Sequence, residues 1–136
     1  MEHVFVDTDI VLDLLSGRLP HYNYAAELFS LADDNSVKVF VSSLTFSNVN
    51  YILTRQYNQD QARKKLLKFK TLVSTLSVND KIVELALSSD FRDFEDALQY
   101  YTAIENGINI LLTRNSKDFK RAEITILSAQ QYLKTI

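Results

Sequence analysis

The sequence contains no cysteine and only two histidines, His3 and His21, among its 136 residues. A disulfide framework and a thiolate metal site are therefore excluded, and a zinc site built from several histidines is not expected. Glycine occurs only twice and proline once, which argues against a loop-rich sandwich and for long regular elements. Apolar runs are all shorter than the roughly 20 residues of a membrane span, so we expect no membrane partner.

The start of the chain, "MEHVFVDTD", also lacks the basic beginning and apolar core of a secretion signal, so we expect a cytoplasmic protein. Hydrophobic residues make up 46% and charged residues 24%, which is ordinary for a soluble globular protein. The length is that of one domain, and no linker, repeat or low-complexity segment interrupts it. We predict a single domain over residues 1–136.

Apolar segments typical of strands alternate along the chain with amphipathic segments typical of helices. The predicted strands are 3–6, 37–42, 71–78, 108–113 and 124–127. The predicted helices are 7–18, 23–34, 43–56, 59–70, 80–89, 94–107 and 128–136, with Ser42 or Ser43, Asn79 and Asp93 as N-caps. This alternation predicts an α/β fold with a central parallel sheet of about five strands and helices on both faces.

The net charge of −2 conceals an uneven distribution of charge. Residues 55–70 contain six basic residues against Asp60 alone, whereas residues 1–50 contain seven acids and two bases. The common explanation of such a run is a solvated helix face. The alternative is that Lys64, Lys65 and Lys68 contact a nucleic-acid backbone beside an acidic centre.

Acidic residues fall where the predicted strands end. Asp7 follows the first strand, Asp96 lies in the first turn of the helix before the fourth strand, and Asp118 comes shortly after that strand. In an open parallel sheet, ligands bind outside the carboxyl ends of the strands, so these acids are expected to converge. Crowded carboxylates repel one another without a cation, and oxygen ligands suit Mg²⁺ or Mn²⁺.

Each acid also has a structural explanation. Asp7 is well placed to cap the helix that begins at Thr8. Asp96 stands three residues after Asp93, which is the spacing of a capping box. Asp118 could be a turn residue. Only the joint placement of the three acids favours a metal site.

Three blocks in order along the chain carry a family resemblance: "FVDTDIVLDLL", "VSSLTFSNVNYIL" and "DFEDALQYYTAIENGINILLTRNSKDF". Together they resemble the PIN-domain ribonucleases, many of which are toxins of bacterial toxin–antitoxin pairs. The last block is the most specific. It combines a helix that begins with acidic residues, a glycine turn, an apolar strand and a polar segment after that strand. The resemblance covers nearly the whole chain and implies a PIN-like fold.

The resemblance implies a metal-dependent endoribonuclease that uses Mg²⁺ or Mn²⁺. Asp7, Asp96 and Asp118 would hold the metal, and Asn48 stands where many members have a catalytic Glu. It further implies that contacts to the metal ligands or to phosphate are made by Asp9, Thr113, Arg114 and Asn115, the last standing where many members have Asp. The implied partners are RNA, an antitoxin protein and a second copy of the chain.

Two alternatives remain at the level of sequence. "DTDIV" is also similar to the start of haloacid-dehalogenase-type phosphatases, in which Asp7 would be the nucleophile and Asp9 the general acid. That family requires a later lysine and an acidic pair, for which "RNSKDF" is a poor match. The second alternative is a weakened PIN fold that binds RNA or a partner without cutting, which Asn48 and Asn115 would favour.

Overall fold

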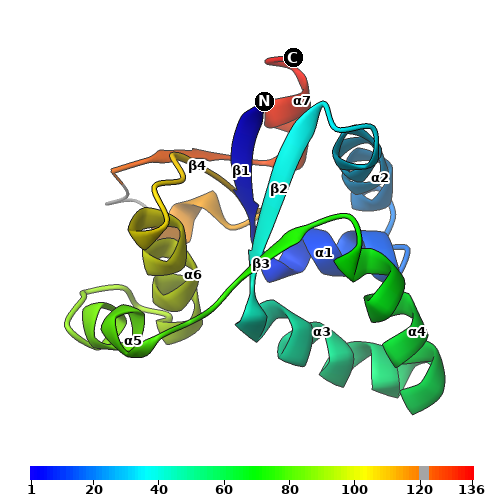
Figure 1. Ribbon diagram of the computed structural model, residues 1–136, viewed down its shortest axis with the longest axis horizontal. Helices are drawn as coiled ribbons and strands as arrows, with labels where there is room; N and C mark the ends of the chain where they lie inside the picture. The colour runs from blue at the N-terminus through cyan, green and yellow to red at the C-terminus, as the bar shows by residue number, and fades with distance from the viewer. Residues whose placement is uncertain (120–122) are drawn as a thin grey trace.

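The computed structural model describes residues 1–119 and 123–136. Within these residues, five strands form one sheet, and seven α-helices and one 3-10 helix (η1) pack around it (Figure 1). In chain order the elements are β1 Glu2–Val6, α1 Thr8–Leu15, α2 His21–Asp33, β2 Val37–Ser42, α3 Ser43–Gln56, α4 Gln59–Lys70, β3 Ser74–Leu76, α5 Asp80–Leu87, α6 Phe94–Glu105, β4 Ile110–Leu112, η1 Ser116–Phe119, β5 Thr125–Leu127 and α7 Ala129–Leu133.

The sheet is parallel throughout and has the strand order β3-β2-β1-β4-β5, which confirms the predicted α/β architecture. β1 occupies the centre, where Phe5 pairs with Phe40 of β2 and with Leu111 of β4. Because all strands run in the same direction, the residues that follow β1 and β4 emerge at the same edge. The chain therefore brings its first and fourth strand ends together.

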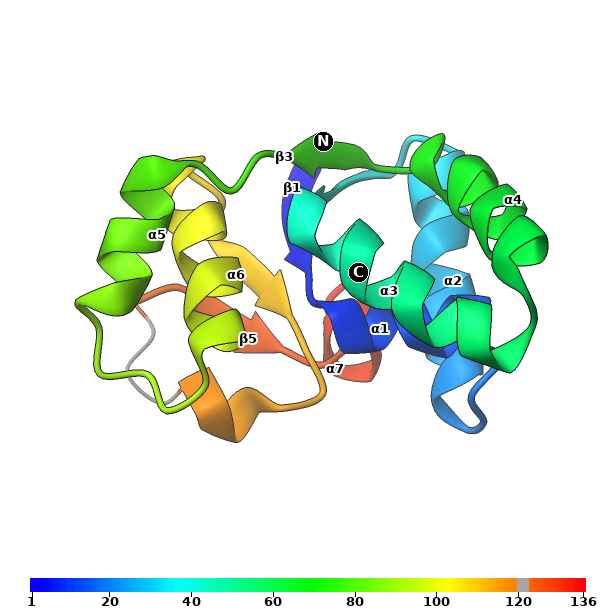
Figure 2. The same cartoon turned by 90° about the horizontal axis from the view of Figure 1, so that it is seen from below.

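The two faces of the sheet are covered by different helices. Val4 and Val6 of β1 belong to a core shared with α1, α2, α3, α4 and α7. Phe5, which points the other way, packs in a second core with α6 and η1. Figure 2 shows α5 and α6 at one end of the molecule, α2 and α4 at the other, and the starts of α1 and α3 between them.

The predicted helix starts are confirmed where a side chain caps them. Oδ1 of Asn79 accepts from the Ile82 N–H at 3.0 Å, and Oδ1 of Asp93 accepts from the Asp96 N–H at 3.0 Å. Ser42 occupies the N-cap of α3, but its side chain makes no capping bond.

The main differences from the prediction concern a strand and a short helix. The predicted strand 71–78 is reduced to β3, because Thr71 caps α4 and the N–H groups of Leu72 and Val73 donate back to the carbonyls of Phe69 and Lys70. The 3-10 helix η1 was not predicted. No helix in the described part of the chain has the length and apolar character to cross a membrane.

Candidate active site

Asp7 links the ends of two neighbouring strands. Its N–H donates to the Leu112 carbonyl of β4 at 2.9 Å, and its Oδ1 accepts from the Thr8 N–H at 2.8 Å. The second carboxylate oxygen, Oδ2, accepts from the Thr113 hydroxyl at 2.9 Å. The residue is only 4% exposed. Asp7 therefore caps α1, as the structural explanation predicted, and also presents a buried acid at the edge of the sheet.

Asp96 lies in the first turn of α6, within electrostatic range of Asp7 and other acids. Burial raises the pKa of Asp96 to about 7, and repulsion from Asp93, Asp118 and Glu95 adds to the rise. Burial likewise raises the pKa of Asp7 to about 7, with further contributions from other acids. Asp96 thus lies within electrostatic range of both Asp7 and Asp118, and their joint service as metal ligands stays a prediction.

The segment after β4 is fastened to the first helix by hydrogen bonds. Oδ2 of Asp9 accepts from the Arg114 N–H at 3.0 Å and lies 3.4 Å from the Thr113 hydroxyl. The Thr113 hydroxyl oxygen in turn accepts from the Asn115 N–H at 3.1 Å. Burial raises the pKa of Asp9, while these contacts with Arg114 oppose the rise. Asp9, Thr113 and Arg114 therefore shape the rim around Asp7.

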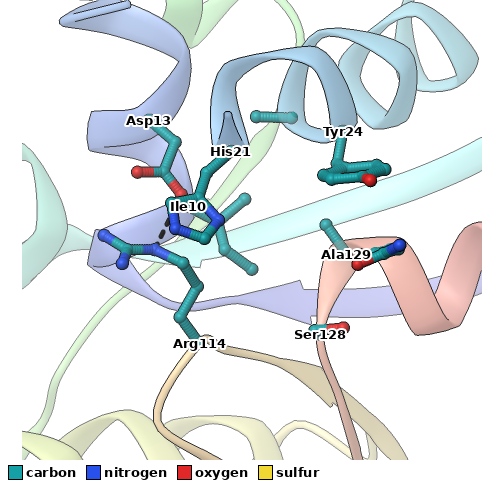
Figure 3. Close-up of a pocket in the computed structure, with 9 residues that line it drawn as sticks. Ile10, Asp13, His21, Tyr24, Arg114, Ser128 and Ala129 are labelled. Carbon is teal, nitrogen blue, oxygen red and sulfur yellow. Dashed lines mark hydrogen bonds and ion pairs between the residues drawn. The ribbon is translucent and has the colours of Figure 1, made fainter. Parts of the chain in front are cut away.

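The Arg114 side chain pairs with Asp13, a partner that the sequence did not indicate (Figure 3). Arg114 Nε donates to Asp13 Oδ2 at 2.9 Å, and Asp13 is 1% exposed. Both residues line a cavity of about 230 Å³ together with His21 and Tyr24 of α2. The guanidinium charge thus neutralises a buried carboxylate of α1, and a contact from Arg114 to phosphate stays a prediction.

Glu95 is a candidate site residue that the sequence patterns did not indicate. Burial and repulsion from Asp93 raise its pKa, while the neighbouring Asn48 amide favours the charged form and lowers it. The Asn48 side-chain nitrogen is buried and has no partner at hydrogen-bonding distance among the described residues. Asn48 therefore faces the acidic centre from α3. The available signal was the position of Glu95 beside Asp96 in the first turn of α6.

The basic helix, α4, lies away from the acidic centre. Lys64 pairs with Asp60 at 3.2 Å on the solvent-exposed side of α4, and Lys65 lies over the Tyr57 ring at 4.7 Å. α4 packs against α3 and stands at the opposite end of the molecule from α6 (Figure 2). A contact of Lys64, Lys65 or Lys68 with RNA therefore requires an RNA path that extends beyond α3.

The acidic centre offers the type of ligand that Mg²⁺ or Mn²⁺ prefers. Its donors are carboxylate and amide oxygens from Asp7, Asp9, Asn48, Glu95 and Asp96. Burial, together with repulsion from nearby acids, raises the pKa of all four acids. Among residues 1–119 and 123–136, no three His, Cys, Asp or Glu side chains are grouped so that they could hold an ion as they stand. The donors fit the metal in chemistry, and binding would have to draw them together.

A parallel five-stranded sheet with acids gathered at its carboxyl edge defines the class of fold and site. The model of the PIN domain family matches residues 3–117, and the chain belongs to this family. It is 27% identical to Ribonuclease VapC1 of Aquifex aeolicus, over 96% of this chain and 93% of that protein. Because haloacid-dehalogenase-type phosphatases form a different family, membership of the PIN domain family excludes that alternative.

Solved structures show the same fold at lower identity. The crystal structure of VapC20 from Mycobacterium tuberculosis, described as a sarcin-ricin loop cleaving toxin, is 21% identical with a TM-score of 0.70, over 90% of this chain and 96% of that one. The crystal structure of VapBC2 from Rickettsia felis, bound to a promoter DNA fragment, is 21% identical with a TM-score of 0.68. The match covers 93% of this chain and 97% of that one.

Proposed function

We propose that this chain is a metal-dependent endoribonuclease and the toxin of a toxin–antitoxin pair. The observation that carries the proposal is that Asp7 and Asp96, from distant parts of the chain, lie within electrostatic range of each other in a crowded acidic centre. The likeness to a ribonuclease over nearly the full length of both chains supports it.

Asp7 and Asp96 would hold Mg²⁺ or Mn²⁺, with Asp118 at the outer side and the Asn48 carbonyl oxygen as a neutral ligand. When bound, the metal supplies activation of water and neutralisation of charge at the phosphate. The chain's own residues orient the ligands: Thr113 holds one oxygen of Asp7, and the Thr8 N–H holds the other. Asp9 fixes the backbone of Arg114 beside them.

Protons compete with the metal at this centre. Because the pKa values of Asp7 and Asp96 are both raised to about 7, each carboxylate carries a proton for part of the time near neutral pH. Metal binding requires the deprotonated forms and would release these protons. Cleavage should therefore increase as the pH rises through about 7.

We further propose an antitoxin partner that binds a groove of about 640 Å³ between α1, α2 and α4. Its lining includes apolar side chains and two lysines: Leu14, Leu15, Ala26, Phe29, Phe69, Leu72, Lys65 and Lys68. A partner segment with apolar and acidic side chains complements this surface. Coexpression with a candidate antitoxin tests the proposal, and Ala26→Arg in the groove should release the bound antitoxin. A homodimer, which the resemblance implies, is checked by light scattering.

The nuclease proposal is tested by incubating the purified protein with several RNA types in Mn²⁺, Mg²⁺ or EDTA. Native protein should cut RNA only with metal, and Asp7→Asn and Asp96→Asn should abolish cutting. Asp80→Asn is the matched control, since Asp80 also lies in the first turn of a helix but outside the acidic centre. RNA that stays intact with native protein in Mn²⁺, yet is bound, would support the non-cutting alternative.

A further inference from the structure

A buried polar cluster lies behind the acids and joins three helices. The side-chain nitrogen of Gln99 in α6 donates to the hydroxyl oxygens of Thr8 in α1 and Thr45 in α3, both at 3.1 Å. The two hydroxyls are 3.1 Å apart and hydrogen-bonded to each other. Gln99 is 0% exposed and Thr45 is 1% exposed. The three side chains therefore form a closed triangle of hydrogen bonds.

Each member of the triangle stands beside a residue of the acidic centre. Thr8 directly follows Asp7, Thr45 lies about one helical turn before Asn48, and Gln99 lies about one turn after Asp96. The contacts span 91 positions between Gln99 and Thr8 and 54 between Gln99 and Thr45. The triangle thus fixes the starts of α1, α3 and α6 relative to one another.

Packing alone does not account for an amide at this position. The Gln99 side-chain oxygen is buried and has no hydrogen-bond partner among the described residues. A buried polar atom without a partner is unfavourable, and an apolar side chain of similar length would avoid it. Polar networks of this kind select one arrangement of the surrounding elements. The amide is therefore best explained by the arrangement that it selects.

We propose that Gln99 is a positioning residue for the acidic centre. Through Thr8 and Thr45 it holds the helix starts so that Asp7, Asn48 and Asp96 face a common metal and phosphate site. This inference rests on the proposed function, since it assigns Gln99 a part in the same chemistry without contact with the substrate.

Thr102 provides a matched control in the same helix. It is also 0% exposed, but its hydroxyl donates to the Leu98 carbonyl of α6 itself at 2.6 Å. Thr102→Val therefore removes a buried polar group whose hydrogen bond lies within α6, so no hydrogen bond between helices is broken. Gln99→Met keeps the length of the side chain and removes the two hydrogen bonds that cross to α1 and α3.

The experiment measures Mn²⁺ binding by calorimetry, RNA cleavage at saturating Mn²⁺ and the melting temperature. Gln99→Met should weaken Mn²⁺ binding by about 10- to 100-fold, as the loss of groups that orient metal ligands does. Thr102→Val should stay within about twofold of native. Thr45→Ser, which keeps the hydroxyl, should retain Mn²⁺ affinity, whereas Thr45→Val should lose it.

Equal Mn²⁺ binding and cleavage in Gln99→Met and Thr102→Val, at comparable melting temperature, would overturn the inference and leave Gln99 a merely structural residue. A native protein that neither binds Mn²⁺ nor cuts RNA would instead overturn the proposed function. The triangle itself is then tested without metal: Gln99→Met and Thr45→Val should be non-additive in urea unfolding, and simple additivity would contradict the contact.

Discussion

The Thr113 hydroxyl donates to Asp7 Oδ2 at 2.9 Å and so joins residues 106 positions apart, at the ends of β4 and β1. Burial and the neighbouring Asp9 raise the pKa of Asp7, whereas the bonds from Thr113 and from the Thr8 N–H lower it. Thr113 therefore helps to keep Asp7 ionised and able to bind metal near neutral pH.

Replacing Thr113 by Val should raise the pKa of Asp7 above its present value of about 7, because the hydroxyl no longer stabilises the carboxylate. Mn²⁺ binding at pH 7 should weaken, and the free energy of unfolding should fall by about 1–3 kcal/mol. Calorimetry and urea unfolding measure these effects. Thr113→Ser should behave like the native protein, and a Val variant with native Mn²⁺ affinity would contradict this role.

Asp96→Asn should stabilise the metal-free protein at high pH. The folded pKa of Asp96 is raised from 3.8 to about 7, so its ionisation opposes folding. This penalty is absent below about pH 4, grows between the two pKa values and is complete above about pH 7. In EDTA, the variant should melt a few degrees above native at pH 8 and equal to it at pH 4. Asp80→Asn serves as the control, and a gain that is independent of pH would argue against the repulsion.

Asn48→Glu should have opposite effects with and without metal. Without metal, the added carboxylate lies near Glu95, whose pKa is already raised, so the melting temperature in EDTA should fall. With Mn²⁺, the same carboxylate supplies a charged ligand, so the metal-induced rise in melting temperature should exceed that of native protein. Asn48→Gln is the neutral control. A Glu variant destabilised equally in EDTA and Mn²⁺ would place Asn48 outside the metal site.

Neutralising Lys64, Lys65 and Lys68 by Gln tests whether α4 contacts RNA. If all three contact phosphates, the slope of log K against log salt should decrease by about 2, since each contact with a single strand contributes about 0.7. Neutralising Lys38, Lys81 and Lys134 removes the same charge elsewhere and should leave the slope nearer to native. Equal slopes for the two triple variants would assign Lys65 and Lys68 to the groove between α1, α2 and α4.

The fold was predictable from local patterns because strands and helices alternate along the chain. A short apolar segment marked β1, alternation of apolar residues marked β2, and polar N-caps such as Asn79 and Asp93 marked helix starts. β3 was overestimated, since "TLVSTLSV" has strand propensity, but Thr71 closes α4 and only three residues pair with β2. The residues of η1 have no apolar periodicity from which a helix could be predicted.

Within the candidate site, Asp7 and Asp96 were predictable because strand ends and first helical turns are local features. The role of Asp13 was not, since it depends on Arg114, 101 positions away. In the sequence, Gln99 has no feature that distinguishes it from other helix residues. Only the folded structure shows that its amide donates to residues of two other helices. Contacts of this kind depend on tertiary structure, which periodicity does not encode.

The central position of β1 has a consequence for synthesis. This strand is synthesised before both of its neighbours, and one of them, β4, is separated from it in the chain by β2, β3 and six helices. A ribosome must therefore translate beyond Thr113 before the sheet can close on both sides of β1 and before Asp7 gains its hydroxyl partner. A nascent chain shorter than this has only part of the acidic centre, so assembly of the centre is delayed until the polypeptide extends beyond Thr113.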